Sequence, residues 1–188
     1  MRDQPRARGI RPFLTAAASL AAASALVSLP PIHARDTQRA DALKAGYLFN
    51  FLKFVEWPPL VPADVLTLCL LSRSGVYDEI STALADKRLG ARRLVARRIT
   101  PTEPLAQCQV LYIDATQLTA VSDVILTRPT ALLTVSDAPD FLRSGGIIAL
   151  FDEGNRLRFR ISVDNARRAD LRISSNLLQL ASAVERES

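Results

Sequence analysis

The sequence predicts an α/β fold: a Rossmann-like, mainly parallel sheet flanked by helices, with an antiparallel hairpin near the C-terminus. Two observations predict it. Between residues 38 and 135, short continuous apolar runs alternate with helical patterns, and such runs are typical of strands buried on both faces of a parallel sheet. After residue 145, two neighbouring strand-like segments are joined by Asp152-Glu153-Gly154-Asn155, which is typical of a hairpin.

The first expected element is a helix at residues 38–56, because apolar residues recur there at spacings of three and four. Asp36 or Thr37 is the expected N-cap. Pro58 and Pro59 should end the helix, since proline disfavours the helical conformation in the residue before it. Gly46 lies in the middle, where glycine costs about 1 kcal/mol of helix stability relative to alanine, and this predicts the close approach of another backbone.

The remaining elements are expected from the same two periodicities, 3.6 residues for helices and 2 residues for half-buried strands. A last helix should close the chain, with Ser174 or Ser175 as its cap. The expected strands are 65–71, 93–98, 110–113, 131–135, 147–151 and 156–163, and the expected helices are 76–84, 118–126 and 175–184.

Residues 1–34 have the pattern of a secretory signal peptide. Arginines precede an uncharged, Ala- and Leu-rich segment at 12–29, and the small residue Ala34 follows shortly after it. Export signals share a basic start, an apolar middle and a small residue at the cleavage site. The alternative is a retained membrane anchor, for which this segment is at the short end. We predict cleavage near Ala34 and a single periplasmic domain at 35–188.

Cleavage would change the chemistry available to the chain. The segment carries four arginines and one aspartate, so 20 basic and 18 acidic side chains and a charge of +2 would remain, which argues against a nucleic-acid partner. The only histidine, His33, would be lost too, and with it the commonest general base and transition-metal ligand. The sequence contains no phosphate-binding or nucleophile motif. We therefore expect no enzyme activity, no metal and no cofactor.

Cys69 and Cys108 are the only cysteines, and export would place them in an oxidising compartment. Each lies in or beside a predicted buried strand, so their Cα atoms come within disulfide range if those strands are neighbours in the sheet. Closing this loop of about 40 residues contributes roughly 4 kcal/mol in the chain-entropy treatment. The alternative is two buried thiols, and we predict the disulfide.

Two aromatic residues near the end of the first helix are candidates for a partner surface. Phe49 lies off the apolar stripe of the helix, and it belongs either to the core or to an interface, since large exposed apolar groups mark interfaces. Trp57 directly follows the helix. We expect either residue to take part in a dimer or partner interface.

The predicted hairpin supplies the other candidates. Arg156, Arg158 and Arg160 alternate with apolar residues, which sets the arginines in a row about 7 Å apart on one face of a strand. One interpretation is that their charge protects a sheet edge. The other is that the row, together with Phe151, contacts an acidic partner or ligand.

Several stretches together resemble the YfiR-like family over nearly all of residues 40–184. The resemblance lies in the order and combination of Ala42-Leu43-Lys44-Ala45-Gly46-Tyr47-Leu48-Phe49-Asn50-Phe51-Leu52-Lys53-Phe54-Val55-Glu56-Trp57-Pro58, Gln107-Cys108-Gln109-Val110-Leu111-Tyr112-Ile113, Leu132-Leu133-Thr134-Val135-Ser136-Asp137, Gly145-Gly146-Ile147-Ile148, Arg156-Leu157-Arg158-Phe159 and Ser174-Ser175-Asn176-Leu177-Leu178-Gln179-Leu180-Ala181. Two positions depart from the family pattern. Well-known members carry a second cysteine pair around the Gly-Gly strand, and their Phe-Glu-Ile-Asn reads Phe159-Arg160-Ile161-Ser162 here.

The resemblance implies a periplasmic α/β protein, often a homodimer, that represses a membrane-bound diguanylate cyclase by binding its periplasmic part. It also implies an outer-membrane lipoprotein that relieves the repression, and a sensitivity to redox state. A periplasmic small-ligand-binding protein that reports to a membrane sensor is the second hypothesis. A hydrolase that uses the loop carboxylates Asp137, Asp140, Asp152 and Glu153 is the third.

Overall fold

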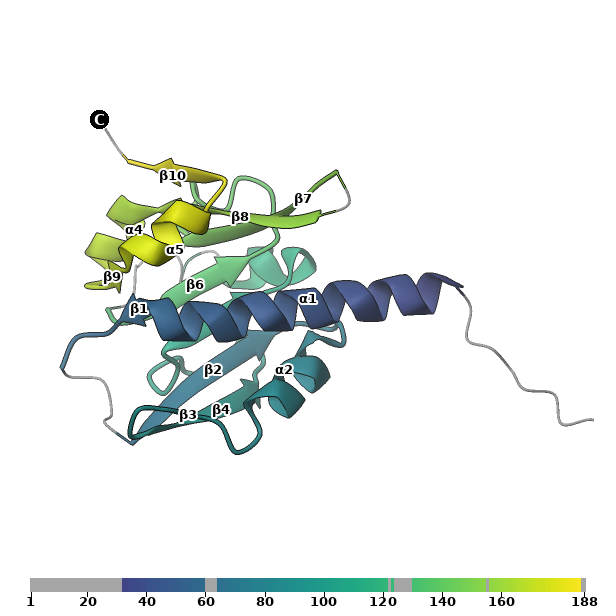
Figure 1. Ribbon diagram of the computed structural model, residues 1–188, viewed down its shortest axis with the longest axis horizontal. Coiled ribbons are helices and arrows are strands. Elements are labelled where there is room, and N and C mark those ends of the chain that lie inside the picture. Colours follow the sequence, from purple (N-terminus) through teal and green to yellow (C-terminus); the bar gives the residue numbers. More distant parts are fainter. Residues whose placement is uncertain (1–31, 60–63, 122, 124–129, 155, 187–188) are drawn as a thin grey trace, which may run out of the picture. The chain divides into compact units, whose positions relative to one another are not determined.

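An eight-stranded sheet organises the chain in the computed structural model, which describes residues 32–59, 64–121, 123, 130–154 and 156–186 (Figure 1). The sheet confirms the predicted fold class. In spatial order its strands are β10 (Ala183–Glu185), β8 (Arg156–Ser162), β7 (Ile148–Glu153), β6 (Leu133–Ser136), β5 (Val110–Ile113), β2 (Val65–Leu71), β4 (Arg92–Arg98) and β3 (Arg88–Leu89).

The centre of the sheet is parallel and its two ends are mixed. Strands β4, β2, β5, β6 and β7 run parallel to one another. The β7–β8 pair is the predicted antiparallel hairpin, with Phe151 opposite Arg158. A two-stranded sheet of β1 (Val55–Glu56) and β9 (Arg172–Ile173) lies apart from the large one.

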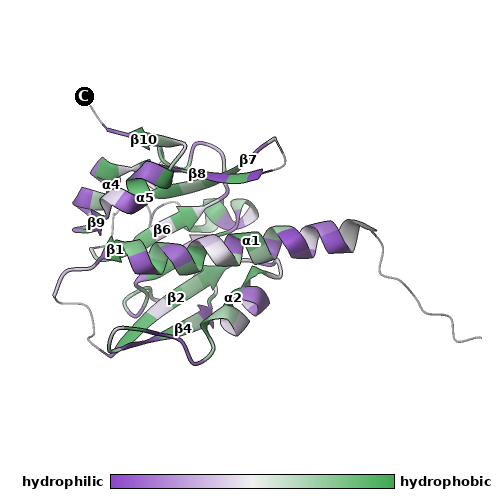
Figure 2. Ribbon diagram, in the orientation of Figure 1, coloured by the Kyte–Doolittle hydropathy of each residue, from purple (hydrophilic) through white to green (hydrophobic). Residues whose placement is uncertain are grey.

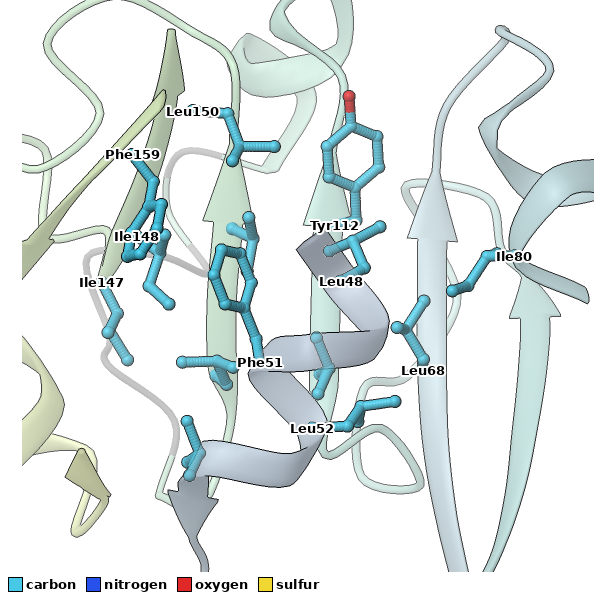
Figure 3. Packing of buried hydrophobic residues seen from close by; sticks show 14 of the residues in the cluster. Leu48, Phe51, Leu52, Leu68, Ile80, Tyr112, Ile147, Ile148, Leu150 and Phe159 are labelled. Atoms are coloured by element: carbon cyan, nitrogen blue, oxygen red, sulfur yellow. The ribbon is translucent and has the colours of Figure 1, made fainter. Parts of the chain in front are cut away.

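Helix α1 (Ile32–Phe54) crosses one face of the sheet, with α2 (Val76–Leu84) beside it (Figure 1). Its buried positions recur every three or four residues, so a single stripe of the helix faces the strands. Figure 3 shows Leu48, Phe51 and Leu52 pointing from α1 onto the sheet, where the Phe51 ring meets the Phe159 ring at a centroid distance of 5.2 Å. Strands β2 and β6 are mostly hydrophobic, whereas α1 alternates (Figure 2). The burial of these apolar side chains against α1 holds this layer together.

The opposite face of the sheet has its own apolar cluster, which contains both cysteines together with Leu111, Ile113 and Phe141. The 3-10 helix η1 (Ala115–Val121) contributes Val121 to this cluster. The expected helix at 118–126 is therefore a 3-10 helix as far as residue 121, and residues 122 and 124–129 lie outside the described part of the chain. Two short helices, α4 (Val163–Arg168) and α5 (Ser175–Leu180), follow the hairpin.

Two expectations about the first helix are wrong. The helix begins at Ile32, so Asp36 and Thr37 lie inside it and do not cap it. A Cβ atom placed on Gly46 would meet nothing within 4 Å, so no described backbone approaches that residue. The helix ends at Phe54, where the chain becomes β1 before it reaches Trp57. Residues 1–31, most of the predicted signal peptide, lie outside the described residues.

The expected last helix at 175–184 is correct only in its first half. Ser174 caps α5, as predicted, by accepting a hydrogen bond from the backbone N–H of Leu177. The helix ends at Leu180 because Ala181 adopts an extended backbone, and the N–H of Ser182 donates to the carbonyl of Phe159 at 2.9 Å. The chain then continues as β10, parallel to β8. Pairing with the hairpin therefore overrides the local helical pattern.

Candidate functional site

The predicted disulfide between Cys69 and Cys108 is confirmed. Strands β2 and β5 are direct neighbours, and Cys69 lies opposite Leu111, three residues beyond Cys108. The two Cα atoms are 5.7 Å apart, within the usual range for a bridge. Both cysteines are buried in the cluster on the face away from α1. The disulfide therefore ties the central strand to the loop that enters its neighbour.

The carboxyl ends of the parallel strands form the edge at which α/β sheets of this kind bind ligands. The chain passes from β2 outward to β4 and then returns to the other side of β2 as β5, so the order reverses between β2 and β5. Ser72 follows β2 and Asp114 follows β5, and the Ser72 hydroxyl donates to the Asp114 carboxylate at 3.1 Å. Sheets of this kind bind their ligands at such a reversal, here between the ends of β2 and β5.

Asp41 of α1 occupies this edge at the start of α2. Its carboxylate accepts a hydrogen bond from the backbone N–H of Gly75 at 2.8 Å, and the residue is only 4% exposed. A helix N-terminus favours negative charge, and Asp41 provides that charge from within the chain. A Cβ atom on Gly75 would lie 2.9 Å from the carboxylate oxygen, so the glycine makes room for this contact.

A second contact from α1 lies at the carboxyl end of β6. The Lys44 ammonium lies 2.5 Å from the Asp137 carboxylate, and both side chains are largely buried. Asp137 also accepts hydrogen bonds from the backbone N–H of Ala115 at 2.8 Å and from the Tyr112 hydroxyl at 3.4 Å. Burial, followed by the nearby charge of Asp137, raises the pKa of Tyr112 far above its ordinary value, so the phenol stays neutral and donates. Asp137 is therefore part of a closed polar cluster.

The loop carboxylates considered for hydrolysis serve mainly in ion pairs. Asp140 lies 3.5 Å from Arg143, and Glu153 lies 3.5 Å from Arg158. In the described part of the chain, no group of three or more His, Cys, Asp and Glu residues could hold a metal ion.

The hairpin brings three of the predicted partner-binding residues together. Phe151 lies opposite Arg158, and the Arg160 guanidinium lies over the Phe151 ring at 4.9 Å from its centroid. Phe159 faces α1, so its neighbours Arg158 and Arg160 face the other side of the sheet. We call Phe151, Arg158 and Arg160 the hairpin face. Arg156 begins the strand at the hairpin turn.

The interpretation of the arginine row as charged edge protection is wrong for part of the strand. Strand β10 pairs with residues 160–162 of β8, so Arg160 does not lie on a sheet edge. Sequence reasoning missed β10 because the expected helix at 175–184 includes its first two residues. The earlier part of β8, residues 156–159, has no described strand on that side.

Phe49 and Trp57 lie elsewhere. Both are half-buried and pack against the apolar cluster on the α1 side of the sheet. The Lys53 ammonium sits 4.1 Å from the centroid of the Phe49 ring, and the indole N–H of Trp57 donates to the carbonyl of Gln109 at 3.3 Å. The structure therefore does not group them with the hairpin face.

Sequence reasoning also missed a groove between α1 and β8. Two hollows, of about 600 Å³ and about 350 Å³, share Arg39, Leu43 and Leu157 as lining residues. We call the larger the outer hollow and the smaller the inner hollow. Leu43 is 47% exposed although it lies on the apolar side of the sequence pattern. Tyr47 lines the smaller hollow, and its hydroxyl donates to the carbonyl of Leu157 at 2.7 Å. Leu43 alone does not predict this groove from the sequence, because the other wall of the groove is formed by β8.

The fold and these contacts define a disulfide-linked α/β protein whose sheet has the ligand-binding topology and whose carboxyl edge carries polar contacts between its own side chains and backbone. The YfiR/HmsC-like family matches residues 41–182, and the chain belongs to this family. The family is associated with periplasmic regulation of diguanylate cyclases, and its members are regulatory and not catalytic proteins.

The fold is similar to that of a conserved domain protein from Vibrio cholerae, with a TM-score of 0.51 and 12% sequence identity. The match covers 77% of this chain and 60% of the Vibrio chain, so this protein spans somewhat less than two thirds of that structure. No curated protein matches the sequence significantly. None of the helices in the described ranges is both long and apolar enough to cross a membrane.

Proposed function

We propose that the chain is a periplasmic regulatory protein that binds and represses a membrane-bound diguanylate cyclase, and so lowers cyclic di-GMP. One observation carries the mechanism: at the carboxyl edge, where this fold class binds small ligands, the charged groups of Asp41 and Lys44 are already engaged in contacts within the chain. Action through the outer surface is then favoured over action through a bound metabolite. Family membership supports the partner class. The same internal contacts of Asp41 and Lys44 count against the hypothesis of a small-ligand-binding protein.

The hairpin face is the proposed contact with the periplasmic part of the cyclase. The cation–π contact between Arg160 and Phe151 holds both side chains in place before a partner arrives. Aromatic and arginine side chains dominate the energetics of protein interfaces, and their truncation costs about 2 kcal/mol or more at hot spots. Arg156 extends the positive charge toward the turn. An acidic and apolar patch on the cyclase would complement this face.

Phe49 and Trp57 belong to a separate proposal. Their partial burial leaves some ring surface for a homodimer interface or for an outer-membrane lipoprotein that relieves repression. Neither residue contributes to the hairpin face, so substitutions there should separate assembly from cyclase repression.

The proposed location is tested by N-terminal sequencing of the protein from its host. We expect the chain to begin near Arg35, inside the first turns of α1 as described here. Finding Met1 intact on protein from the cytoplasmic fraction would exclude the periplasmic function.

The proposed activity is tested by deleting the gene and measuring cyclic di-GMP. The level should rise in the deletion strain and return to normal when the wild-type gene is restored. A Phe151→Ala plus Arg158→Ala variant should fold but fail to restore it. The matched control is Tyr77→Ala plus Arg98→Ala, which removes a similar aromatic–arginine contact from α2 and β4. Unchanged cyclic di-GMP in the deletion strain, under several growth and envelope-stress conditions, would falsify the regulatory claim.

A further inference from the structure

The groove between α1 and β8 borders a free stretch of sheet edge. Strand β10 covers only residues 160–162 of β8, and among the described residues no other strand pairs on that side. The carbonyl of Phe159 points to this side, since it accepts from Ser182, so the backbone groups of Leu157, two residues earlier, point there too. The Leu157 carbonyl accepts the Tyr47 hydroxyl at 2.7 Å, and a carbonyl oxygen has a second lone pair. The edge therefore still offers hydrogen bonds to an incoming strand.

The groove has an apolar centre. Leu43 from α1 and Leu157 from β8 line both hollows, and the Tyr47 ring lines the inner one. Leu43 is one of only two large hydrophobic side chains among the described residues that are exposed. An apolar side chain of a bound segment would cover these groups, and side chains of a strand alternate between the two faces.

The two hollows of the groove differ in the charged side chains that line them. The charged residues of the inner hollow are all arginines, namely Arg39, Arg156 and Arg158. No ion pair joins Arg39 or Arg156 to a described residue. The buried Nε of Arg158 has no hydrogen-bond partner among the described residues, although it lies 3.5 Å from Glu153. The outer hollow adds Asp36, Asp152 and Lys44, and the Lys44 ammonium is already paired with Asp137. The inner end of the groove therefore favours an acidic group and the outer end favours a basic one.

We propose that this groove binds an extended segment of a partner protein that adds a strand to the free edge of β8. The segment carries an acidic residue at the inner end, an apolar residue over Leu43 and Leu157, and a basic residue near Asp36 and Asp152. Strand addition of this kind takes its affinity from main-chain hydrogen bonds and its specificity from alternate side chains. Arg158 belongs to both the groove and the hairpin face, whereas Phe151 and Arg160 line neither hollow. The two surfaces therefore adjoin at Arg158 and differ in their other residues.

The test uses the full mature chain and labelled, end-capped synthetic peptides, measured by fluorescence anisotropy. The probe alternates apolar and polar residues, with glutamates at one end and lysines at the other. A second peptide exchanges the two charged ends, and a third carries N-methyl groups on alternate backbone nitrogens. We expect binding of the probe alone among the three. Amide hydrogen exchange at Leu157 should slow when the probe binds.

Two variants from different elements test the position of the site. Leu43→Glu and Arg156→Glu should each weaken probe binding by about tenfold or more, because each removes a complementary group from the groove. Leu180→Glu and Arg73→Glu are the matched controls, since Leu180 is also exposed and Arg73 is an exposed arginine in the loop that follows β2 and lines neither hollow. Thermal unfolding checks that all four variants fold.

Equal binding of the probe and the charge-exchanged peptide would overturn the proposal, as would full binding by the N-methylated peptide or by both groove variants. Failure of the probe to bind would do the same. These outcomes do not depend on cyclic di-GMP. Cyclic di-GMP can stay unchanged in the deletion strain while the groove still binds its peptide, which would contradict the regulatory function alone. A rise in cyclic di-GMP without peptide binding would contradict the groove proposal alone.

Discussion

The carboxylate of Asp41 accepts a hydrogen bond from the backbone N–H of Gly75, 34 residues further along the chain, at 2.8 Å. It joins the first helix to the start of the second at the edge where a sheet of this topology binds ligands. The contact favours a glycine, since a Cβ atom on residue 75 would lie 2.9 Å from the carboxylate oxygen and would push it away. The stability of the fold and the packing of α1 at this edge therefore depend on the same pair.

We predict that Asp41→Ala lowers the free energy of unfolding by about 2 kcal/mol, because it removes a largely buried, charge-assisted hydrogen bond. Gly75→Ala should also destabilise, through the close contact with Asp41. In the Asp41→Ala plus Gly75→Ala double variant, the loss of unfolding free energy caused by Gly75→Ala should be smaller, because the Asp41 carboxylate that the new Cβ atom meets is absent. Urea unfolding of all variants measures these differences.

The control for this cycle is Gly46→Ala. Residue 46 is exposed in the same helix, and an added Cβ atom meets nothing there. Alanine should therefore stabilise the protein by up to about 1 kcal/mol through helix propensity. Purely additive losses for Asp41 and Gly75 would contradict the proposed contact.

The second prediction concerns Tyr112 and alkaline pH. The pKa of Tyr112 is raised in the folded protein, mainly by burial and then by Asp137. The unfolded chain releases this proton near pH 10 and the folded chain does not. The stabilising contribution is therefore complete below about pH 10 and decreases by up to roughly 1.4 kcal/mol per pH unit above it.

Urea unfolding of the wild type and Tyr112→Phe between neutral pH and pH 11 tests this dependence. The variant should lose less stability than the wild type over the alkaline range, because phenylalanine cannot ionise. Tyr77→Phe, which changes a half-buried tyrosine on α2, serves as the control. Parallel stability curves for wild type and Tyr112→Phe would show that the phenol is not held neutral by the fold.

The third prediction concerns the disulfide. Replacing both Cys69 and Cys108 by alanine should lower the free energy of unfolding by about 3–4 kcal/mol, because the unfolded chain loses a cross-link across a long loop. Reductant should destabilise the wild type and leave the double variant unchanged. Two thiols open to alkylation after denaturation without reductant would mean that the exported protein carries no bridge.

The sequence predicts the features of this fold that depend on local patterns. The strands at 65–71 and 110–113 are continuous apolar runs, and their adjacency brings Cys69 within reach of Cys108. The Asp41–Gly75 contact depends on how α1 crosses the sheet, so no local sequence pattern predicts it. An aspartate on the buried stripe of α1 was the one available signal.

The same distinction explains what was missed at the C-terminus. Residues 181–185 have an acceptable helical pattern, and only the N–H of Ser182 bonding to Phe159 turns them into a strand. Because β10 was not anticipated, the remaining free edge of β8 was not anticipated either. The hairpin face, by contrast, follows directly from the alternation of residues 156–162.

The central claim is that the protein represses a cyclase by surface contact, and the most direct measurement is the rate of cyclic di-GMP synthesis in a reconstituted system. The membrane cyclase that co-purifies with the cross-linked protein is placed in nanodiscs, where both of its sides are accessible. Adding the wild-type protein should lower the rate to a plateau, and the Phe151→Ala plus Arg158→Ala variant should lower it far less. An unchanged rate at saturating wild-type protein, or the absence of any cyclase among the cross-linked partners, would contradict the account.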